Sequence, residues 1–180
     1  MFIFHHYQSR VVNHFAVLVL LILCLFCQRV VAQDNNYQIK AAYLYQFSNF
    51  VKWQVLKDEF VIGIVSDADI IGEFEVIEGK KIKGKPVRFI AIHQLEQLDD
   101  CCSLVFVAID KKAQLHSFLA KLRNKPVLTV LDHQYPKNSN GMIQFVRSGT
   151  KLKFTVNNTL AKNHGINFSA FLLQVAKDVY

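Results

Sequence analysis

Four short, largely apolar runs in the middle of the chain restrict its fold more than any other feature. They span residues 60–67, 87–93, 103–109 and 127–132, and the first is apolar up to its last two residues. Strands covered by helices on both faces have this continuous pattern, whereas strands with one wet face alternate between apolar and polar side chains. The runs therefore predict the buried strands of a mainly parallel sheet.

Segments with helical spacing separate these runs. Their apolar residues repeat every three or four positions, at Ile70, Ile71, Phe74 and Ile77, and at Leu115, Phe118, Leu119 and Leu122. Residues 142–146 and 151–156 instead alternate, which predicts an antiparallel β-hairpin at the sheet edge. Residues 167–180 predict a closing helix. The fold class expected is therefore α/β, with a mainly parallel central sheet flanked by helices.

A further helix is predicted ahead of the first strand, over residues 37–53. Its apolar side chains form one broad stripe, which we expect to pack on the sheet, at Ile39, Tyr43, Phe47, Phe50 and Val51. Tyr45 lies off this stripe, so we expect an aromatic side chain at the surface of the helix.

The N-terminal segment predicts export across a membrane. Residues 15–27 form an apolar core behind Arg10 and are followed by small residues up to Ala32. This order is typical of a secretory signal peptide, and the core is short for a membrane span, which takes about 20 apolar residues. We expect cleavage after Ala32, so that residues 1–32 are removed and residues 33–180 form a single domain. An uncleaved membrane anchor is the alternative.

The mature chain is expected to be mildly basic. Loss of Arg10 and Arg29 with the signal lowers the formal net charge from +7 to +5. The densest basic cluster consists of Lys80, Lys81, Lys83 and Lys85. It is either an electrostatic patch for anionic lipid, glycan or an acidic protein, or a solvated loop between two strands. Nucleic acid is not an expected partner, because no aromatic residues are interleaved with these lysines.

Two adjacent cysteines, Cys101 and Cys102, remain once Cys24 and Cys27 leave with the signal. Export implies an oxidising compartment. Three states are open for the pair: two buried thiols at a strand edge, a disulfide between the two neighbours, or a bridge between two chains. Free cysteine is among the most buried residue types, so we expect the first state.

Acidic residues and a histidine follow several of the predicted strands, at Asp67, Asp69, Asp110, Asp132 and His133. Ligands of open α/β sheets bind at this edge. Asp67, Asp110 and His133 therefore define an alternative function, that of a small-ligand-binding domain. The competing interpretation is that an aspartate ahead of a helix is its N-cap.

Motifs for catalysis are absent from the sequence. It contains neither a Gly-x-Ser-x-Gly nucleophile elbow nor a glycine loop that ends in Gly-Lys-Ser or Gly-Lys-Thr. The four histidines after the signal are far apart, and no Cys-x-x-Cys motif is present. We therefore expect no enzyme, no metal and no cofactor.

A series of motifs resembles the YfiR-like family of periplasmic regulators. The matching segments are residues 40–53, 60–65, 79–87, 102–107, 126–132, 141–145, 153–157 and 166–173. In the sixth segment, Asn140 stands where the family's Gly-Gly-Met-Ile motif has its first glycine. Each motif alone is short, but their order and spacing cover nearly all of residues 38–178.

The resemblance implies a non-enzymatic regulator in the periplasm. The best-known members of the family bind the periplasmic sensor domain of an inner-membrane diguanylate cyclase and hold it inactive, which lowers cyclic di-GMP and favours motility over biofilm. A membrane sensor kinase is the alternative partner for this chain, and a homodimer is a further open alternative. The well-studied members have two intramolecular disulfides. Here Cys102 matches the family's strand-edge cysteine but has no distant partner, which leaves a bridge across a homodimer or no bridge.

The residues that we expect to contact such a partner are Tyr45, Trp53, Lys80, Lys81, Lys83 and Lys85. They combine surplus aromatic side chains of the first helix with the basic loop. The competing interpretation is core packing for Trp53 and simple solvation for the lysines.

Overall fold

The computed structural model describes residues 36–54, 56–98, 102–109, 111–136 and 139–180. The expected signal peptide, its cleavage site, Cys101 and Asp110 lie outside the described residues. Within the part that is described, none of the helices combines the length and the apolar character needed to cross a membrane.

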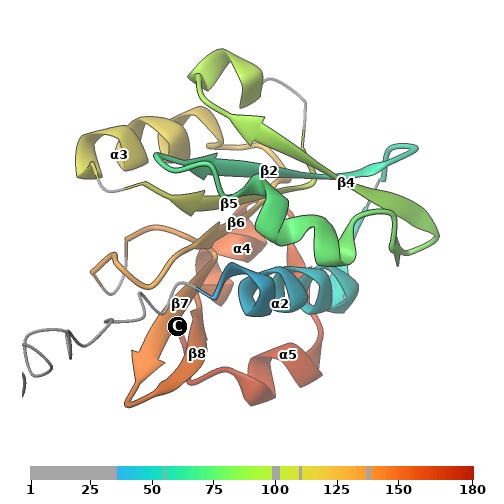
Figure 1. The fold of residues 1–180 in the computed structure, drawn as a ribbon. Coiled ribbons are helices and arrows are strands. Elements are labelled where there is room, and N and C mark those ends of the chain that lie inside the picture. The colour runs from blue at the N-terminus through green and yellow to red at the C-terminus, as the bar shows by residue number, and fades with distance from the viewer. Residues whose placement is uncertain (1–35, 55, 99–101, 110, 137–138) are drawn as a thin grey trace, which may run out of the picture. The chain divides into compact units, whose positions relative to one another are not determined.

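The four apolar runs form the parallel centre of an eight-stranded sheet with the order β10-β8-β7-β6-β5-β2-β4-β3 (Figure 1). The central strands are β2 (Phe60–Ser66), β4 (Lys85–Ile92), β5 (Leu104–Ala108) and β6 (Leu128–Leu131). All neighbours among them pair in parallel. This confirms the α/β class and the mainly parallel sheet.

The predicted hairpin extends this sheet on the β6 side. β7 (Ile143–Ser148) pairs in parallel with β6, and β8 (Lys151–Val156) pairs antiparallel with β7. The two-residue strand β10 (Asp178–Val179) pairs in parallel with β8 and forms the outermost strand there. At the opposite edge, β3 (Lys81–Ile82) pairs antiparallel with β4.

Helices cover both faces of the sheet (Figure 1). The larger core contains side chains of α2 (Tyr37–Phe50), the 3-10 segment η1 (Ile71–Ile77), α4 (Asn158–Asn163) and α5 (Ala170–Val175). The second core contains side chains of α3 (Lys112–Lys121) and the 3-10 segment η2 (Leu95–Leu98). A small separate sheet joins β1 (Val51–Lys52) to β9 (Asn167–Phe168) in antiparallel register.

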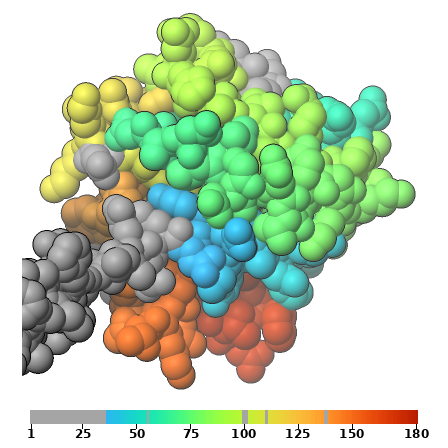
Figure 2. Space-filling model, viewed as in Figure 1, coloured from blue at the N-terminus to red at the C-terminus, as the bar shows by residue number. Residues whose placement is uncertain are grey.

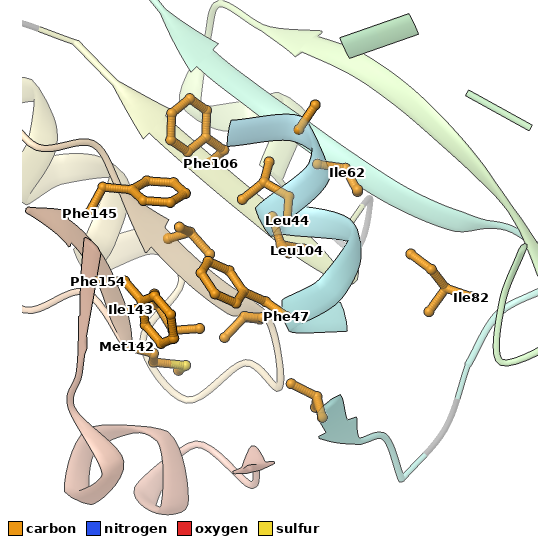
Figure 3. Close-up of a cluster of buried hydrophobic side chains, with 14 of the residues drawn as sticks. Leu44, Phe47, Ile62, Ile82, Leu104, Phe106, Met142, Ile143, Phe145 and Phe154 are labelled. Atoms are coloured by element: carbon orange, nitrogen blue, oxygen red, sulfur yellow. The ribbon is translucent and has the colours of Figure 1, made fainter. Parts of the chain in front are cut away.

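Successive residues of the central strands enter opposite cores. In β5, Leu104 and Phe106 pack under α2, whereas Val105 and Val107 pack under α3. Figure 3 shows the first of these cores, where Phe47 of α2 lies with its ring 4.8 Å from that of Phe154. Because both faces are covered, the strands are apolar throughout, which is the pattern read from the sequence.

The predicted stripe of α2 packs on the larger core except at Ile39, but the buried face also includes residues outside the stripe, and the helix ends earlier than predicted. Its buried residues are Lys40, Ala41, Leu44, Phe47 and Ser48, whereas Ile39 is 48% exposed. The helix ends at Phe50 instead of residue 53, because Val51 turns to an extended conformation and pairs with Phe168. Two carbonyls at its C-terminal end find partners outside the helix. The indole of Trp53 donates to Ser48, and the amide of Ser169 donates to Phe50, each at 2.8 Å.

The closing helix is shorter than predicted. α5 begins after Ser169, whose hydroxyl accepts from the amide of Leu172 at 3.3 Å, and it ends at Val175. Beyond it the chain is extended: Lys177 donates to the carbonyl of Phe154, and Tyr180 donates to that of Val156. This pairing gives hydrogen-bond donors to backbone carbonyls of β8. A longer helix would have left those carbonyls without these partners.

The segment that leads into β7 restricts which residue types fit at positions 140 and 141. Asn140 has a φ of 64°, a left-handed conformation that asparagine tolerates better than most residues other than glycine. This is the position where the family motif has glycine. A Cβ on Gly141 would lie 2.8 Å from Leu131 Cδ1 and 3.2 Å from the Ile143 carbonyl oxygen. Close packing therefore excludes a side chain at Gly141, and the left-handed backbone at position 140 favours glycine or asparagine.

We expect Gly141→Ala to lower the free energy of unfolding by about 1–3 kcal/mol, because the added methyl group displaces the fully buried Leu131. The matched control is Gly72→Ala, since a Cβ at Gly72 meets no atom within 4 Å. Urea denaturation of both variants measures the difference. Equal stabilities for the two would contradict the close packing described for Gly141.

Candidate protein-binding surface

Two of the sequence-predicted contact regions lie next to each other. The Tyr45 hydroxyl donates to the carbonyl of Lys81 at 3.2 Å, and Lys80 Nζ lies 5.8 Å from the centroid of the Tyr45 ring. Tyr45 thus holds the strand β3 against α2. In Figure 2, α2 forms a blue band beside the green segment that contains η1, β3 and β4. We call Tyr45 together with Lys80, Lys81, Lys83 and Lys85 the basic surface.

The geometry of the β3–β4 turn keeps most of these lysines in solvent. Lys83 and Gly84 have φ angles of 50° and 84°, so the chain reverses tightly between the two strands. Lys80, Lys81 and Lys83 are exposed, and among the described residues none of the three forms an ion pair. Lys85 Nζ lies 3.4 Å from Asp58 Oδ1, an exposed pair of the kind that contributes little stability.

Acidic side chains of η1 and of the residue after it lie close to the basic surface in sequence. Glu73 accepts from Gln38, and Glu78 accepts from the amide of Phe89, each at 3.2 Å, while Glu75 is exposed. Lysines on a short edge strand also have a purely structural use, because they prevent unwanted pairing at that edge. The exposed cations of β3 are consistent with this use and with a contact to an acidic partner.

Trp53 lies in different surroundings from Tyr45. Its indole nitrogen donates to the carbonyl of Ser48, and its ring packs edge-on against Phe60 with centroids 5.1 Å apart. The residue is half-buried against the larger core. These contacts match the core-packing interpretation of Trp53.

A buried ion pair lies at the C-terminal end of β6. Lys40 Nζ of α2 donates to Asp132 Oδ2 at 2.9 Å, and the two side chains are 2% and 0% exposed. Asp132 Oδ1 accepts from the amide of His133 at 2.7 Å and lies 2.8 Å from His133 Nδ1. Lys40 Nζ also lies 4.3 Å from the centroid of the Tyr37 ring. The carboxylate therefore has partners on both oxygens.

The sequence pattern points to Asp132 and His133 as candidate site residues but not to Lys40. A signal for it exists: Lys40 has the helical spacing of the buried face that contains Leu44 and Phe47. A lysine on such a face needs a buried anion. The aspartate after a buried strand is the natural candidate.

The other strand ends do not form a ligand site in the described residues. Asp67 and Asp69 are exposed beyond the end of β2, and Asp110 is not among the described residues. Gln134 and Tyr135 close the end of β5, because both side chains donate to the carbonyl of Ile109, at 2.9 and 2.6 Å. In the described part of the chain, no three His, Cys, Asp or Glu side chains converge as metal ligands.

Cys102 is disulfide-bonded, so the expectation of two free thiols is wrong for this residue. Its partner lies outside the described residues, which contain no other cysteine. Cys102 packs against the second core, and a Cβ on Gly63 of β2 would lie 2.9 Å from its sulfur. The absence of a side chain at Gly63 thus makes room for the bonded sulfur.

We expect Lys40→Met to lower the free energy of unfolding by about 3–5 kcal/mol, because it leaves the carboxylate of Asp132 buried without its cation. The double variant Lys40→Met/Asp132→Asn should recover much of this loss, since the uncompensated charge is gone. Lys112→Met, at an exposed position of α3, is the control and should change stability little. Urea denaturation at neutral pH decides: a Lys40→Met variant as stable as the control would refute the buried pair.

Comparison with known proteins supports the resemblance seen in the sequence. The family model described as YfiR/HmsC-like matches residues 37–177, which include every described helix and nearly all of the sheet. No curated protein matches the chain. Because the matched segment is most of the chain, the assignment applies to the whole described fold: this chain belongs to the YfiR/HmsC-like family.

Proposed function

We propose that the protein is a periplasmic regulator that binds the periplasmic sensor domain of an inner-membrane diguanylate cyclase and holds the cyclase inactive. Family membership supports a regulatory role, and the signal-like segment before Ala32 supports export. The observation that carries the choice of surface is the hydrogen bond from Tyr45 of α2 to the Lys81 carbonyl, because it joins β3 and its neighbouring exposed lysines to α2.

Repression of this kind requires differential binding. A regulator that shifts a two-state partner from 1:99 to 99:1 must bind one state about 10⁴-fold more tightly than the other, which corresponds to about 5.5 kcal/mol. Exposed ion pairs contribute about 0.2–1 kcal/mol each, so three lysines are too few to supply this difference. Their role is to select and orient an acidic partner.

Apolar contacts have to supply the remaining free energy. Val76 is 52% exposed on η1, which packs on α2 and on β4. It lies one residue before the buried Ile77, whose carbonyl accepts from the amide of Lys80. We therefore place Val76 in the proposed contact, beside Tyr45 and the lysines.

A second copy of the chain is the other expected partner. Phe171 and Val175 of α5 are 54% and 46% exposed, and the Phe171 ring lies 5.0 Å from that of Phe50. This apolar face lies on α5, separate from the basic surface, so pairing through it would leave the lysines free for the cyclase.

We expect the charge reversal Lys81→Glu/Lys83→Glu to weaken binding to the cyclase's periplasmic domain by about tenfold or more, because it places like charges against an acidic surface. The matched control is Lys111→Glu/Lys112→Glu, which makes the same change of charge at exposed residues of the α3 end (Figure 1). Calorimetric titration with the periplasmic domain of a diguanylate cyclase encoded beside this gene measures both affinities.

A cellular test distinguishes failure of the proposed function from failure of the proposed contact surface. Deletion of the gene should raise the cyclic di-GMP level. Complementation with the wild-type gene or with the Lys111/Lys112 control should lower it again, whereas the Lys81/Lys83 variant should leave it high. If deletion leaves cyclic di-GMP unchanged, the proposed function fails. If deletion raises the cyclic di-GMP level and the Lys81/Lys83 variant lowers it fully to the wild-type level, the proposed function stands and the proposed surface is wrong.

A further inference from the structure

A hollow of about 560 Å³ opens between α3, α4 and the connection into β7, away from the basic surface. It is lined by His116, Leu119, Ala120, Leu122, Arg123, Thr129, Asn140, Met142, Leu160 and His164. This volume is in the range of small-molecule sites, about 300–1,000 Å³. The lining comes from four separate parts of the chain, so the hollow depends on the folded domain.

One face of each helix builds the walls. His116, Leu119, Ala120 and Arg123 follow one another at i, i+3, i+4 and i+7 along α3 and past its end, and Leu160 and His164 are four residues apart at α4. Residues with these spacings share one helix face. Both helix faces therefore point into the same space, with apolar and polar side chains side by side.

Thr129 is the polar residue of the buried lining, which is otherwise apolar, and the exposed lining is mostly polar. Leu122 and Met142 are buried, at 3% and 2% exposure, while His116, Arg123 and Asn140 are exposed. Within the described residues, the side chains of these three rim residues have no hydrogen-bond or ion-pair partner. His164 Nδ1 lies 2.9 Å from the carbonyl oxygen of Leu160, which orients its ring at the edge of the hollow.

No acidic residue is among those that line the hollow. From Lys111 to Lys177 the sequence contains one acidic residue, Asp132, and its carboxylate is buried against Lys40. Arg123 therefore has no acidic competitor among the lining residues. A guanidinium with free donors beside an apolar floor suits a carboxylate or phosphate attached to an apolar body.

We propose that this hollow is a binding site for a small organic anion, with its apolar body against Leu122 and Met142 and its anionic group at Arg123. The site is independent of the proposed cyclase contact, because it shares no residue with the basic surface. It is also distinct from the strand ends, where the carboxylate of Asp132 is already satisfied.

Isothermal titration calorimetry with three probes tests the chemistry of the site. 2-Naphthoate carries both the anion and the apolar body, 2-naphthamide carries the body alone, and inorganic phosphate carries the anion alone. We expect 2-naphthoate to bind with a single site per chain and the other two probes to bind about tenfold or more weakly.

Three variants locate the binding. Arg123→Gln should weaken 2-naphthoate about tenfold, because the charge-assisted hydrogen bonds are lost. Ala120→Phe should abolish binding by filling the hollow from an exposed position. Lys153→Gln is the matched control, since it removes the same charge at an exposed residue of β8 and should leave the affinity unchanged.

Several outcomes would overturn the proposal. No saturable binding of 2-naphthoate by the wild-type protein would do so, as would equal affinities for the naphthoate and the amide. Equal losses in Arg123→Gln and Lys153→Gln would show that net charge, and not this site, governs binding. Circular dichroism of each variant confirms the native fold, so loss of binding is read only from folded protein.

Discussion

A buried ion pair fixes the first helix on the sheet, and the position of the basic surface follows from it. Lys40 joins α2 to the end of β6 through Asp132, while Trp53 and Ser169 hold the carbonyls at the other end of the helix. Tyr45 lies between these two attachments, so its hydroxyl reaches Lys81 from a rigid element. A buried pair of this kind contributes little net stability compared with apolar residues, but it strongly disfavours arrangements that separate its members. We infer that it sets the position of α2 along the sheet.

The distribution of charge gives the two candidate surfaces different chemistry. Around β3, exposed lysines follow the glutamates of η1 along the chain, and charges of both signs on one surface can orient a protein partner. Between Lys111 and Lys177 the only carboxylate is that of Asp132, and it is buried against Lys40. The hollow beside Arg123 lies in this second half. A protein contact and a small-anion site can therefore coexist on one domain without sharing residues.

The strands and their parallel order could be predicted from sequence because burial on both faces makes each strand apolar throughout. Features that depend on tertiary partners could not. The buried face of α2 was predicted around Ile39, but the partner of Lys40 is far away in sequence and draws the lysine inward. Residues 176–180 have an apolar pattern compatible with a helix, yet pairing with β8 decides their conformation. The contact of Tyr45 with β3 and the hollow at Arg123 likewise join segments that no local pattern connects.

Amide hydrogen exchange of the complex with the cyclase's periplasmic domain tests the central claim most directly. The account predicts slower exchange over residues 71–86 and in the part of α2 around Tyr45, with α3 and α4 unaffected. A stable complex whose protection is confined to α3, α4 or α5 would contradict it.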